Sequence, residues 1–164
     1  MCKIRKNHHT HTTFTTNIMN YTRVQAYFYT FAAGIYLNRI HFNTMHYFSR
    51  LENTIKSNWN GISVANFRGE SFTYGELATQ IARFHVFFEA VGLKKGDKVA
   101  LCAKNSARWG ITFFAANTYE AVLVPILADF HPESVNSLVD HSESKVLLTD
   151  TDIWAKLANY FTIL

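Results

Sequence analysis

The sequence predicts an α/β fold, in which an N-terminal hairpin and a helix precede a parallel sheet of βαβαβ connectivity. Apolar stretches of strand length recur at residues 99–102, 122–126 and 145–149. Such stretches are typical of parallel strands that are covered on both faces. Segments with helical spacing of apolar residues separate them. Alternating strands and helices with short links imply right-handed crossovers and a parallel sheet.

The elements before the sheet are indicated by turn and capping residues. Residues 48–55 form a short helical segment, and the apolar runs 64–67 and 72–73 flank a turn, which indicates a hairpin. Thr73 and Glu76 have the spacing of a capping box, so a helix should begin there. Its expected apolar face and its glycine stop are Leu77, Ile81, Phe84, Phe88 and Gly92.

The elements of the sheet follow in order. Residues 94–97 form a polar turn before the first strand, and Asn105 or Ser106 can cap the next helix, which should be largely buried. Pro125 stands at the end of the second strand, where its missing N–H costs little. Pro132 is a plausible first residue of the following helix, and Asp150 or Asp152 can cap the last one. The expected apolar faces of these two helices are Val135, Leu138 and Val139, and Ile153, Trp154, Leu157, Ala158 and Phe161.

Residues 1–44 do not indicate a domain, because they show neither a helical stripe nor alternation bounded by turns. Their apolar run, 24–37, is shorter than the roughly 20 residues that span a bilayer, so no transmembrane segment is expected. Three interpretations stay open: a leader such as a transit peptide, a disordered tail, or translated sequence ahead of a true start at Met45. Composition favours the last. No metal site is expected at His8, His9 and His11, because no Cys or carboxylate stands near them to complete a coordination shell.

Charge and cysteine content limit the classes of partner. The net charge of +4 comes from the front of the chain, because residues 1–51 hold six Lys and Arg and no acidic residue, against ten and twelve in the remainder. A basic groove for nucleic acid is therefore not expected. Cys2 and Cys102 are far apart and Cys102 lies in an apolar run, so no disulfide is expected and a reducing, cytoplasmic location fits.

Five sequence strings, read in order, resemble motifs of the AMP-forming acyl-activating enzymes, also called the adenylate-forming or AMP-dependent synthetase and ligase superfamily. The first is Phe-Thr-Tyr-Gly-Glu-Leu at 72–77, which is similar to the first core motif of that family. The second is Gly-Leu-Lys-Lys-Gly-Asp-Lys-Val-Ala at 92–100, and the third is Asn-Ser with a Trp three residues after the Ser, at 105–109. Residues 121–126 resemble the second core motif, and 142–147 resemble a Ser-Glu-x-Lys entry to a strand.

The resemblance implies that residues 45–164 are the N-terminal part of an AMP-binding domain, an incomplete N-terminal subdomain. Long-chain fatty acyl-CoA synthetases are the nearest group, which implies a ligase of fatty acid metabolism that makes an acyl-adenylate with ATP and then an acyl-CoA thioester. ATP, Mg²⁺ and coenzyme A are implied for the complete enzyme. The family's Ser/Thr/Gly-rich phosphate loop, which ends in Pro-Lys, does not occur in the sequence.

The resemblance therefore assigns no catalytic, cofactor-binding or metal-binding residue to this chain. We expect the chain alone to be inactive, as the product of a truncated or split gene whose partner is the remaining part of the synthetase. The alternative is a non-catalytic interaction subunit, or one that complements a full synthetase.

Three further features have both a functional and a structural interpretation. Titratable residues flank one predicted helix and could form an acid/base cluster, although solvated surface is the favoured interpretation. They are His131, Asp140, His141 and Glu143. Trp109, Phe113 and Phe114 could line an acyl pocket, although core packing is favoured. Glu120 replaces the glycine that usually precedes the second core motif. Tolerance in an exposed turn is the favoured interpretation, and a decayed copy of the enzyme is the alternative.

Overall fold

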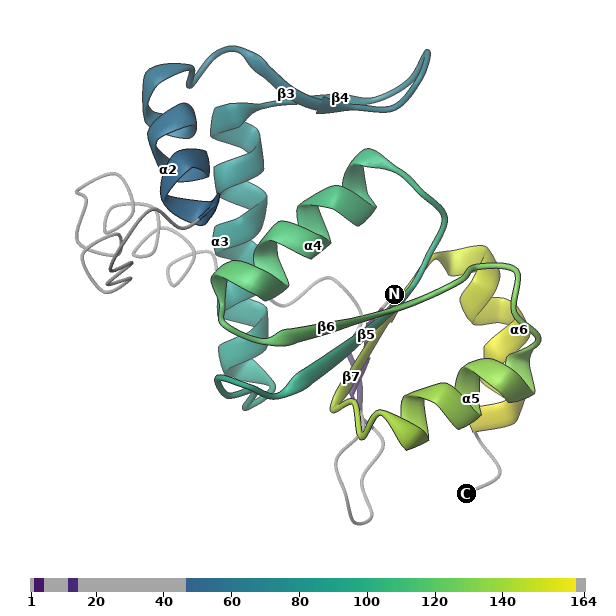
Figure 1. Cartoon of the computed structure of the whole chain (residues 1–164). Coiled ribbons are helices and arrows are strands. Elements are labelled where there is room, and N and C mark those ends of the chain that lie inside the picture. Colours follow the sequence, from purple (N-terminus) through teal and green to yellow (C-terminus); the bar gives the residue numbers. More distant parts are fainter. Residues whose placement is uncertain (1, 5–11, 15–46, 162–164) are drawn as a thin grey trace. The chain divides into compact units, whose positions relative to one another are not determined.

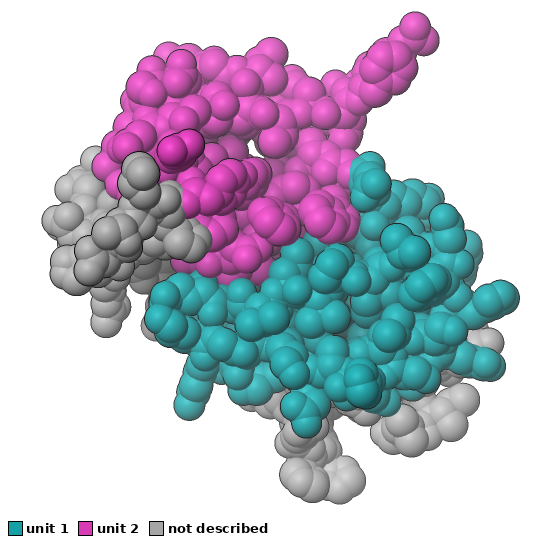
Figure 2. Space-filling view, in the orientation of Figure 1, with its two compact units in different colours: residues 1–18, 88–105, 119–164 teal, residues 19–87, 106–118 magenta. Residues whose placement is uncertain are grey.

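The computed structural model describes residues 2–4, 12–14 and 47–161 (Figure 1). The chain divides into two compact units (Figure 2). The first contains Met1–Ile18, Phe88–Asn105 and Tyr119–Leu164, and the second contains Met19–Phe87 and Ser106–Thr118. The predictions for residues 5–11 and 15–44, including the histidines, lie outside the described residues.

The second unit begins with helix α2 (Tyr47–Ser57), followed by strands β3 (Ile62–Ala65) and β4 (Ser71–Thr73), which pair antiparallel. The predicted hairpin is confirmed, although Asn66 and Phe67 belong to its turn instead of its first strand. Helix α3 (Tyr74–Ala90) starts at the predicted capping box: the Thr73 N–H donates to Glu76 Oε2 at 2.8 Å, and the Glu76 N–H donates to Thr73 Oγ1 at 3.2 Å. Helix α4 (Ala107–Thr118) completes the unit.

The predicted apolar faces of helices α3 and α4 differ in how far they are buried. Leu77, Ile81 and Phe88 of α3 are buried as expected, whereas Phe84, also expected on this face, is half-buried. Helix α4 was expected to be largely buried, but only Ile111, Ala115 and their neighbours are, whereas the aromatic side chains are half-buried. Those aromatic side chains contact one another, with Trp109 and Phe113 stacked at a centroid distance of 6.0 Å and Phe113 edge-on to Phe114 at 5.6 Å.

The first unit contains the predicted parallel sheet, made of β5 (Lys98–Cys102), β6 (Val122–Ile126) and β7 (Val146–Thr149). β5 lies between the other two and is parallel to both. Helices α5 (Pro132–His141) and α6 (Thr151–Phe161) follow β6 and β7, and α5 starts at Pro132 as predicted. The three strands and both helices confirm the α/β prediction.

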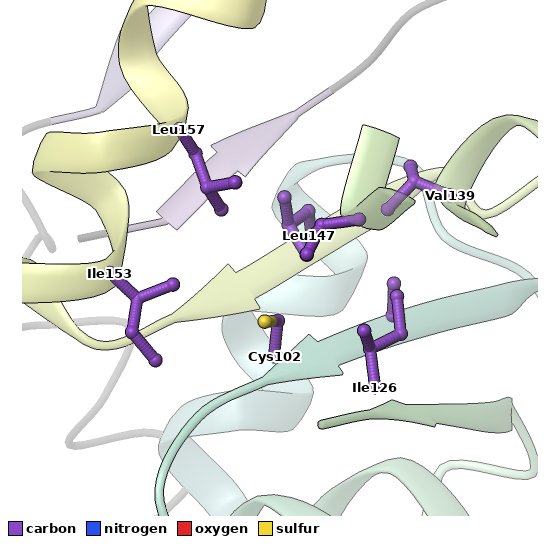
Figure 3. Close-up of a cluster of buried hydrophobic side chains, with 8 residues drawn as sticks. Cys102, Ile126, Val139, Leu147, Ile153 and Leu157 are labelled. Carbon is purple, nitrogen blue, oxygen red and sulfur yellow. The ribbon is translucent and has the colours of Figure 1, made fainter. Parts of the chain in front are cut away.

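One face of this sheet is covered by both helices (Figure 3). Cys102, Ile126 and Leu147 from the strands meet Val139 of α5, together with Ile153 and Leu157 of α6. On the opposite face Val99 and Val146 are also buried, so β5 and β7 have the burial on both faces that their apolar composition predicts. Leu138 was expected on the buried face of α5 but is exposed, because only Val135 and Val139 point into the cluster.

The sheet is extended by two strands that the sequence pattern did not predict. β1 (Cys2–Ile4) pairs antiparallel with β7, and β2 (Thr12–Phe14) pairs antiparallel with β1. The order of the five strands is therefore β2-β1-β7-β5-β6. The sequence pattern missed both because three residues are too few to show alternation, and the main-chain groups of β7 direct the pairing instead.

β6 forms the other edge of the sheet within the described part of the chain. The Val122 N–H donates to the Asp97 carbonyl at 2.9 Å, so the alternation of a strand directs the main-chain groups of Leu123 and Pro125 away from β5. Pro125 is the fourth of five strand residues, not the last, and its nitrogen faces outward. The missing N–H of Pro125 therefore removes no hydrogen bond to β5, which is why this edge of the sheet tolerates proline.

Candidate functional site at the carboxyl ends of the strands

In open α/β sheets, ligands bind outside the carboxyl ends of the parallel strands, so that end of the first unit is the candidate site. Four charged residues follow the three strands there. Lys104 comes after β5, Asp129 after β6, and Asp150 and Asp152 after β7. A charged residue that follows an apolar strand run is the sequence feature that marks this end of the sheet. From the sequence, Asp150 and Asp152 were predicted only as helix caps.

Lys104 connects two of these loops. Its main-chain N–H donates to Asp150 Oδ2 at 2.8 Å, and its Nζ lies 2.5 Å from Asp152 Oδ2. The side chain of Asp150 therefore binds the β5 loop, and α6 begins with a main-chain bond from the Trp154 N–H to the Asp150 carbonyl. The hydrogen bond and charge of Asp152 raise the pKa of Lys104, and the hydrogen bond from Lys104 in turn lowers the pKa of Asp152.

The charge of this end does not suit a triphosphate. The four charged residues that follow the strands are three carboxylates, of Asp129, Asp150 and Asp152, and one ammonium, of Lys104. That ammonium is already paired with Asp152. A phosphate cradle needs main-chain N–H groups, hydroxyls or cations that are free to face an anion. Among the described residues, no group of three or more His, Cys, Asp or Glu side chains is placed to hold a metal ion.

Cys102, the last residue of β5, is a fully buried free thiol at the same end. Its Sγ donates to the Leu127 carbonyl at 3.7 Å. Burial, with a smaller contribution from the negative charge of Asp150, raises the pKa of Cys102 to about 11. The thiol is therefore protonated near neutral pH and is not a nucleophile.

At the opposite, amino ends of the strands, three of the five motif strings run into β5, β6 and β7, and Asp97 links two of these strings. Asp97 Oδ2 accepts the Lys94 N–H at 2.7 Å, and Asp97 Oδ1 lies 2.7 Å from Lys145 Nζ. Burial acts to raise the pKa of Asp97, but the hydrogen bonds from Lys145 and Lys94 outweigh it and hold that pKa below its ordinary value. The aspartate of string 92–100 and the lysine of string 142–147 thus form one structural connection.

Backbone conformation explains the glycines of this region and the departure at Glu120. Gly92 and Gly96 have φ values of +75° and +80°, which favour glycine. Glu120 has a φ of +64°, so it occupies a left-handed position, at the place where the resemblance implies glycine. Its side chain is exposed and lies 2.6 Å from Lys95 Nζ. The exposed turn tolerates the carboxylate, as predicted, but with backbone strain.

The first and third motif strings lie in the second unit and also serve the fold. Besides the capping box at 73–76, the Ser106 hydroxyl accepts the Trp109 N–H at 3.1 Å, as the predicted cap of α4. Asn66 adds a connection that sequence reasoning missed, because its Oδ1 accepts the Ala107 N–H at 2.7 Å. Asn66 stands 41 residues before its partner, and no local pattern marks such a contact.

The titratable residues around α5 are not brought together. His131 precedes the first residue of the helix and His141 is its last, so roughly 15 Å of helix separates them. Both imidazoles are exposed. Glu143 lies beyond the helix and pairs with Lys98 at 3.8 Å. His131 is therefore separated from the other three residues, and all four side chains are exposed, as the solvated-surface interpretation predicts.

Comparison with known proteins places the chain. A family model described as AMP-binding enzyme matches residues 52–160. The chain belongs to the AMP-binding enzyme family. It is 36% identical over 78 residues to the crotonobetaine/carnitine–CoA ligase of Proteus mirabilis, and 30% identical over 91 residues to an acetyl-coenzyme A synthetase of Shewanella sp.. These matches cover 48% and 56% of this chain but 15% and 14% of the relatives, so the chain spans a small part of their length.

Solved structures of AMP-binding enzymes share the fold. A fatty acyl CoA synthetase of Mycobacterium tuberculosis superposes with a TM-score of 0.62 at 24% identity, over 70% of this chain and 23% of that one. Coronafacic acid ligase of Pectobacterium brasiliense gives a TM-score of 0.67 at 20% identity, over 72% and 23%. The prediction of an adenylate-forming N-terminal fold is thereby confirmed. In the described part of the chain, no helix combines the length and apolarity needed to cross a membrane.

Proposed function

We propose that this chain is the N-terminal scaffold of an ATP-dependent acyl-CoA synthetase, which forms an acyl-adenylate and then a coenzyme A thioester. The family match over residues 52–160 carries the proposal. The names of the two relatives, a carnitine–CoA ligase and an acetyl-coenzyme A synthetase, support a carboxylic acid as substrate and coenzyme A as acceptor. The resemblance to long-chain fatty acyl-CoA synthetases favours a fatty acid, and the buried free thiol of Cys102 fits a cytoplasmic enzyme.

The described residues do not fit ATP and Mg²⁺ by themselves. Adenylation requires groups that cradle phosphates and a cation that neutralises developing charge. The carboxyl ends of the strands carry net negative charge instead. The motif residues Thr73, Asp97 and Lys145 are engaged in a helix cap and in an ion pair at a turn. We therefore infer that the chain alone has no adenylating activity, and that residues outside this sequence supply the phosphate loop and the catalytic groups.

A chimera tests the proposal. The matched segment of the Proteus ligase would be replaced by residues 52–160, and thioester formation would be measured with the ligase's own substrate. If these residues are an interchangeable scaffold, the chimera retains activity within about a factor of 100, which corresponds to roughly 2.7 kcal/mol of misplacement. A matched chimera with Asp97→Ala serves as a control for a damaged scaffold. A folded chimera without detectable activity would contradict the proposal.

The second candidate is a non-catalytic subunit that pairs with or complements a synthetase. The sequence holds no Ser/Thr/Gly-rich loop that ends in Pro-Lys, so in this candidate a partner carries the phosphate loop. A neighbouring gene that begins at a Ser/Thr/Gly-rich loop with Pro-Lys would support this candidate. Such a loop continuing in the same reading frame would favour a single polypeptide.

A further inference from the structure

The placement of helices α5 and α6 indicates where the sheet would continue after α6. α5 leads from β6 across β5 to β7, and α6 covers the same face of the sheet as α5. Successive crossovers of the same hand on the same face advance in the same direction. A parallel strand that follows α6 would therefore lie on the far side of β7 from β5. That is the position that β1 occupies.

The main-chain groups of β7 at this edge belong to two residues. The Lys145 N–H donates to the Lys98 carbonyl on β5 at 2.9 Å, so alternation directs the main-chain groups of Val146 and Leu148 outward. In the register of β1, Ile4 stands opposite Val146 and Cys2 opposite Leu148. These outward groups are thus opposite β1, in antiparallel orientation, whereas β5, β6 and β7 are mutually parallel.

The β7 edge suits strand addition better than the opposite edge of the sheet. On β6 the outward residues are Leu123 and Pro125, and Pro125 has no N–H to donate. On β7 both outward residues can donate and accept. The side chains of Val146 and Leu148 are also buried, with 1% and 7% of the residue surface exposed. An added strand there would need apolar side chains.

We propose that β1 competes with a parallel, apolar strand for the β7 edge, so that the chain's own N-terminus blocks its joining to the remaining part of the sheet. This inference rests on the proposed function, because the incoming strand is the one that follows the counterpart of α6 in a longer AMP-binding enzyme. The relatives are long enough to contain it, since the matched part is 15% of the Proteus ligase. Joining exchanges one set of main-chain hydrogen bonds for another, and β1 must leave.

The experiment uses the full chain and a probe made from the Proteus ligase. The probe begins directly after the ligase's counterpart of Phe161 and carries a fluorophore. Its affinity is measured for the parent chain, for Ile4→Pro, which removes the main-chain donor opposite Val146, and for the matched control Ile4→Val, which keeps it. Hydrogen exchange at the amides of Ile4, Val146 and Leu148 is followed in the same samples.

Competition predicts that Ile4→Pro binds the probe about tenfold more tightly than the parent does, while Ile4→Val binds like the parent. In the parent chain, the probe should make the Ile4 amide exchange faster while the Val146 and Leu148 amides remain protected. Unchanged affinity of Ile4→Pro, absence of binding to it, or persistent protection of Ile4 in the complex would overturn the inference. Thioester formation by the complex is scored separately. Tight binding without activity would count against the proposed function alone, and activity with unchanged affinity against this inference alone.

Discussion

The amino and carboxyl ends of the parallel strands in the first unit use charge in different ways. At the amino ends, Asp97 accepts the Lys94 N–H and pairs with Lys145, and only 17% of its side chain is exposed. At the carboxyl ends, Lys104 and Asp152 pair with 65% and 57% of their side chains exposed. Partly buried, charge-assisted bonds contribute to stability, whereas exposed pairs contribute little. The motif residues Asp97 and Lys145 of the sheet therefore stabilise the scaffold.

The largest effect is expected at Asp97. Asp97→Ala should lower the free energy of unfolding by about 1.5 kcal/mol, because the Lys94 N–H and the Lys145 ammonium lose their common acceptor. Asp97→Asn keeps an acceptor for the Lys94 N–H and should cost less. Urea denaturation followed by circular dichroism measures both. Equal stability of Asp97→Ala and the parent chain would show that the amino ends are no more tightly coupled than the carboxyl ends.

A smaller gain in stability is expected at Glu120. Glu120→Gly should stabilise the chain by about 0.5–1 kcal/mol, because glycine adopts its φ of +64° without strain and this outweighs the loss of the exposed ion pair with Lys95. Glu120→Ala is the matched control, since it loses the ion pair and keeps the strain. Thermal unfolding should rank the glycine variant above the parent and the alanine variant at or below it. The reverse ranking would show that the ion pair dominates.

Acid should weaken the amino ends in a defined range of pH. Because the folded-state pKa of Asp97 lies below its ordinary value of 3.8, the unfolded chain binds more protons in that range, and stability falls with falling pH. The contribution is complete well above pH 3.8 and is lost as the pH passes below it through the folded-state pKa. Asp97→Asn should therefore show a shallower loss of stability between about pH 5 and 2 than the parent does. Parallel curves would contradict the assigned coupling.

The secondary structure of these regions was largely predictable from the sequence, whereas the contacts between residues distant in the sequence were not. The capping box at Thr73 and Glu76, the strands at 99–102 and 122–126, and the start of α5 at Pro132 follow from local patterns and were confirmed. The pairing of Asp97 with Lys145 was not predictable, because 48 residues separate them and either side chain alone resembles a solvated turn residue.

The candidate site was less predictable than the fold. The positions of Lys104, Asp129 and Asp150 follow from strand ends, but which loops the lysine joins depends on the strand order β7-β5-β6. Strands β1 and β2 could not be predicted, because pairing with an existing edge requires only main-chain groups. The residues around α5 were expected at the solvated surface, and all four side chains are exposed.

The smallest effect is expected at the carboxyl ends. Lys104→Met and Asp152→Asn should leave the urea midpoint unchanged within error, because both side chains of this pair are largely exposed. The double variant should equal the sum of the single ones, and raising the salt concentration should not separate it from the parent chain. A clear loss of stability in either variant would show that this end is also part of the scaffold.

We propose that this chain supplies the scaffold of an acyl-CoA synthetase and no adenylating chemistry. ATP–pyrophosphate exchange measures that chemistry most directly, using purified chain with Mg²⁺ and acetate, carnitine and a long-chain fatty acid in turn. Exchange should stay at the level of a blank without protein, because the described carboxyl ends present carboxylates and a paired lysine to the phosphates. Carboxylate-dependent exchange above the blank, lost in Lys104→Met but retained in Glu120→Ala, would contradict the account and place the chemistry at the carboxyl ends of the strands.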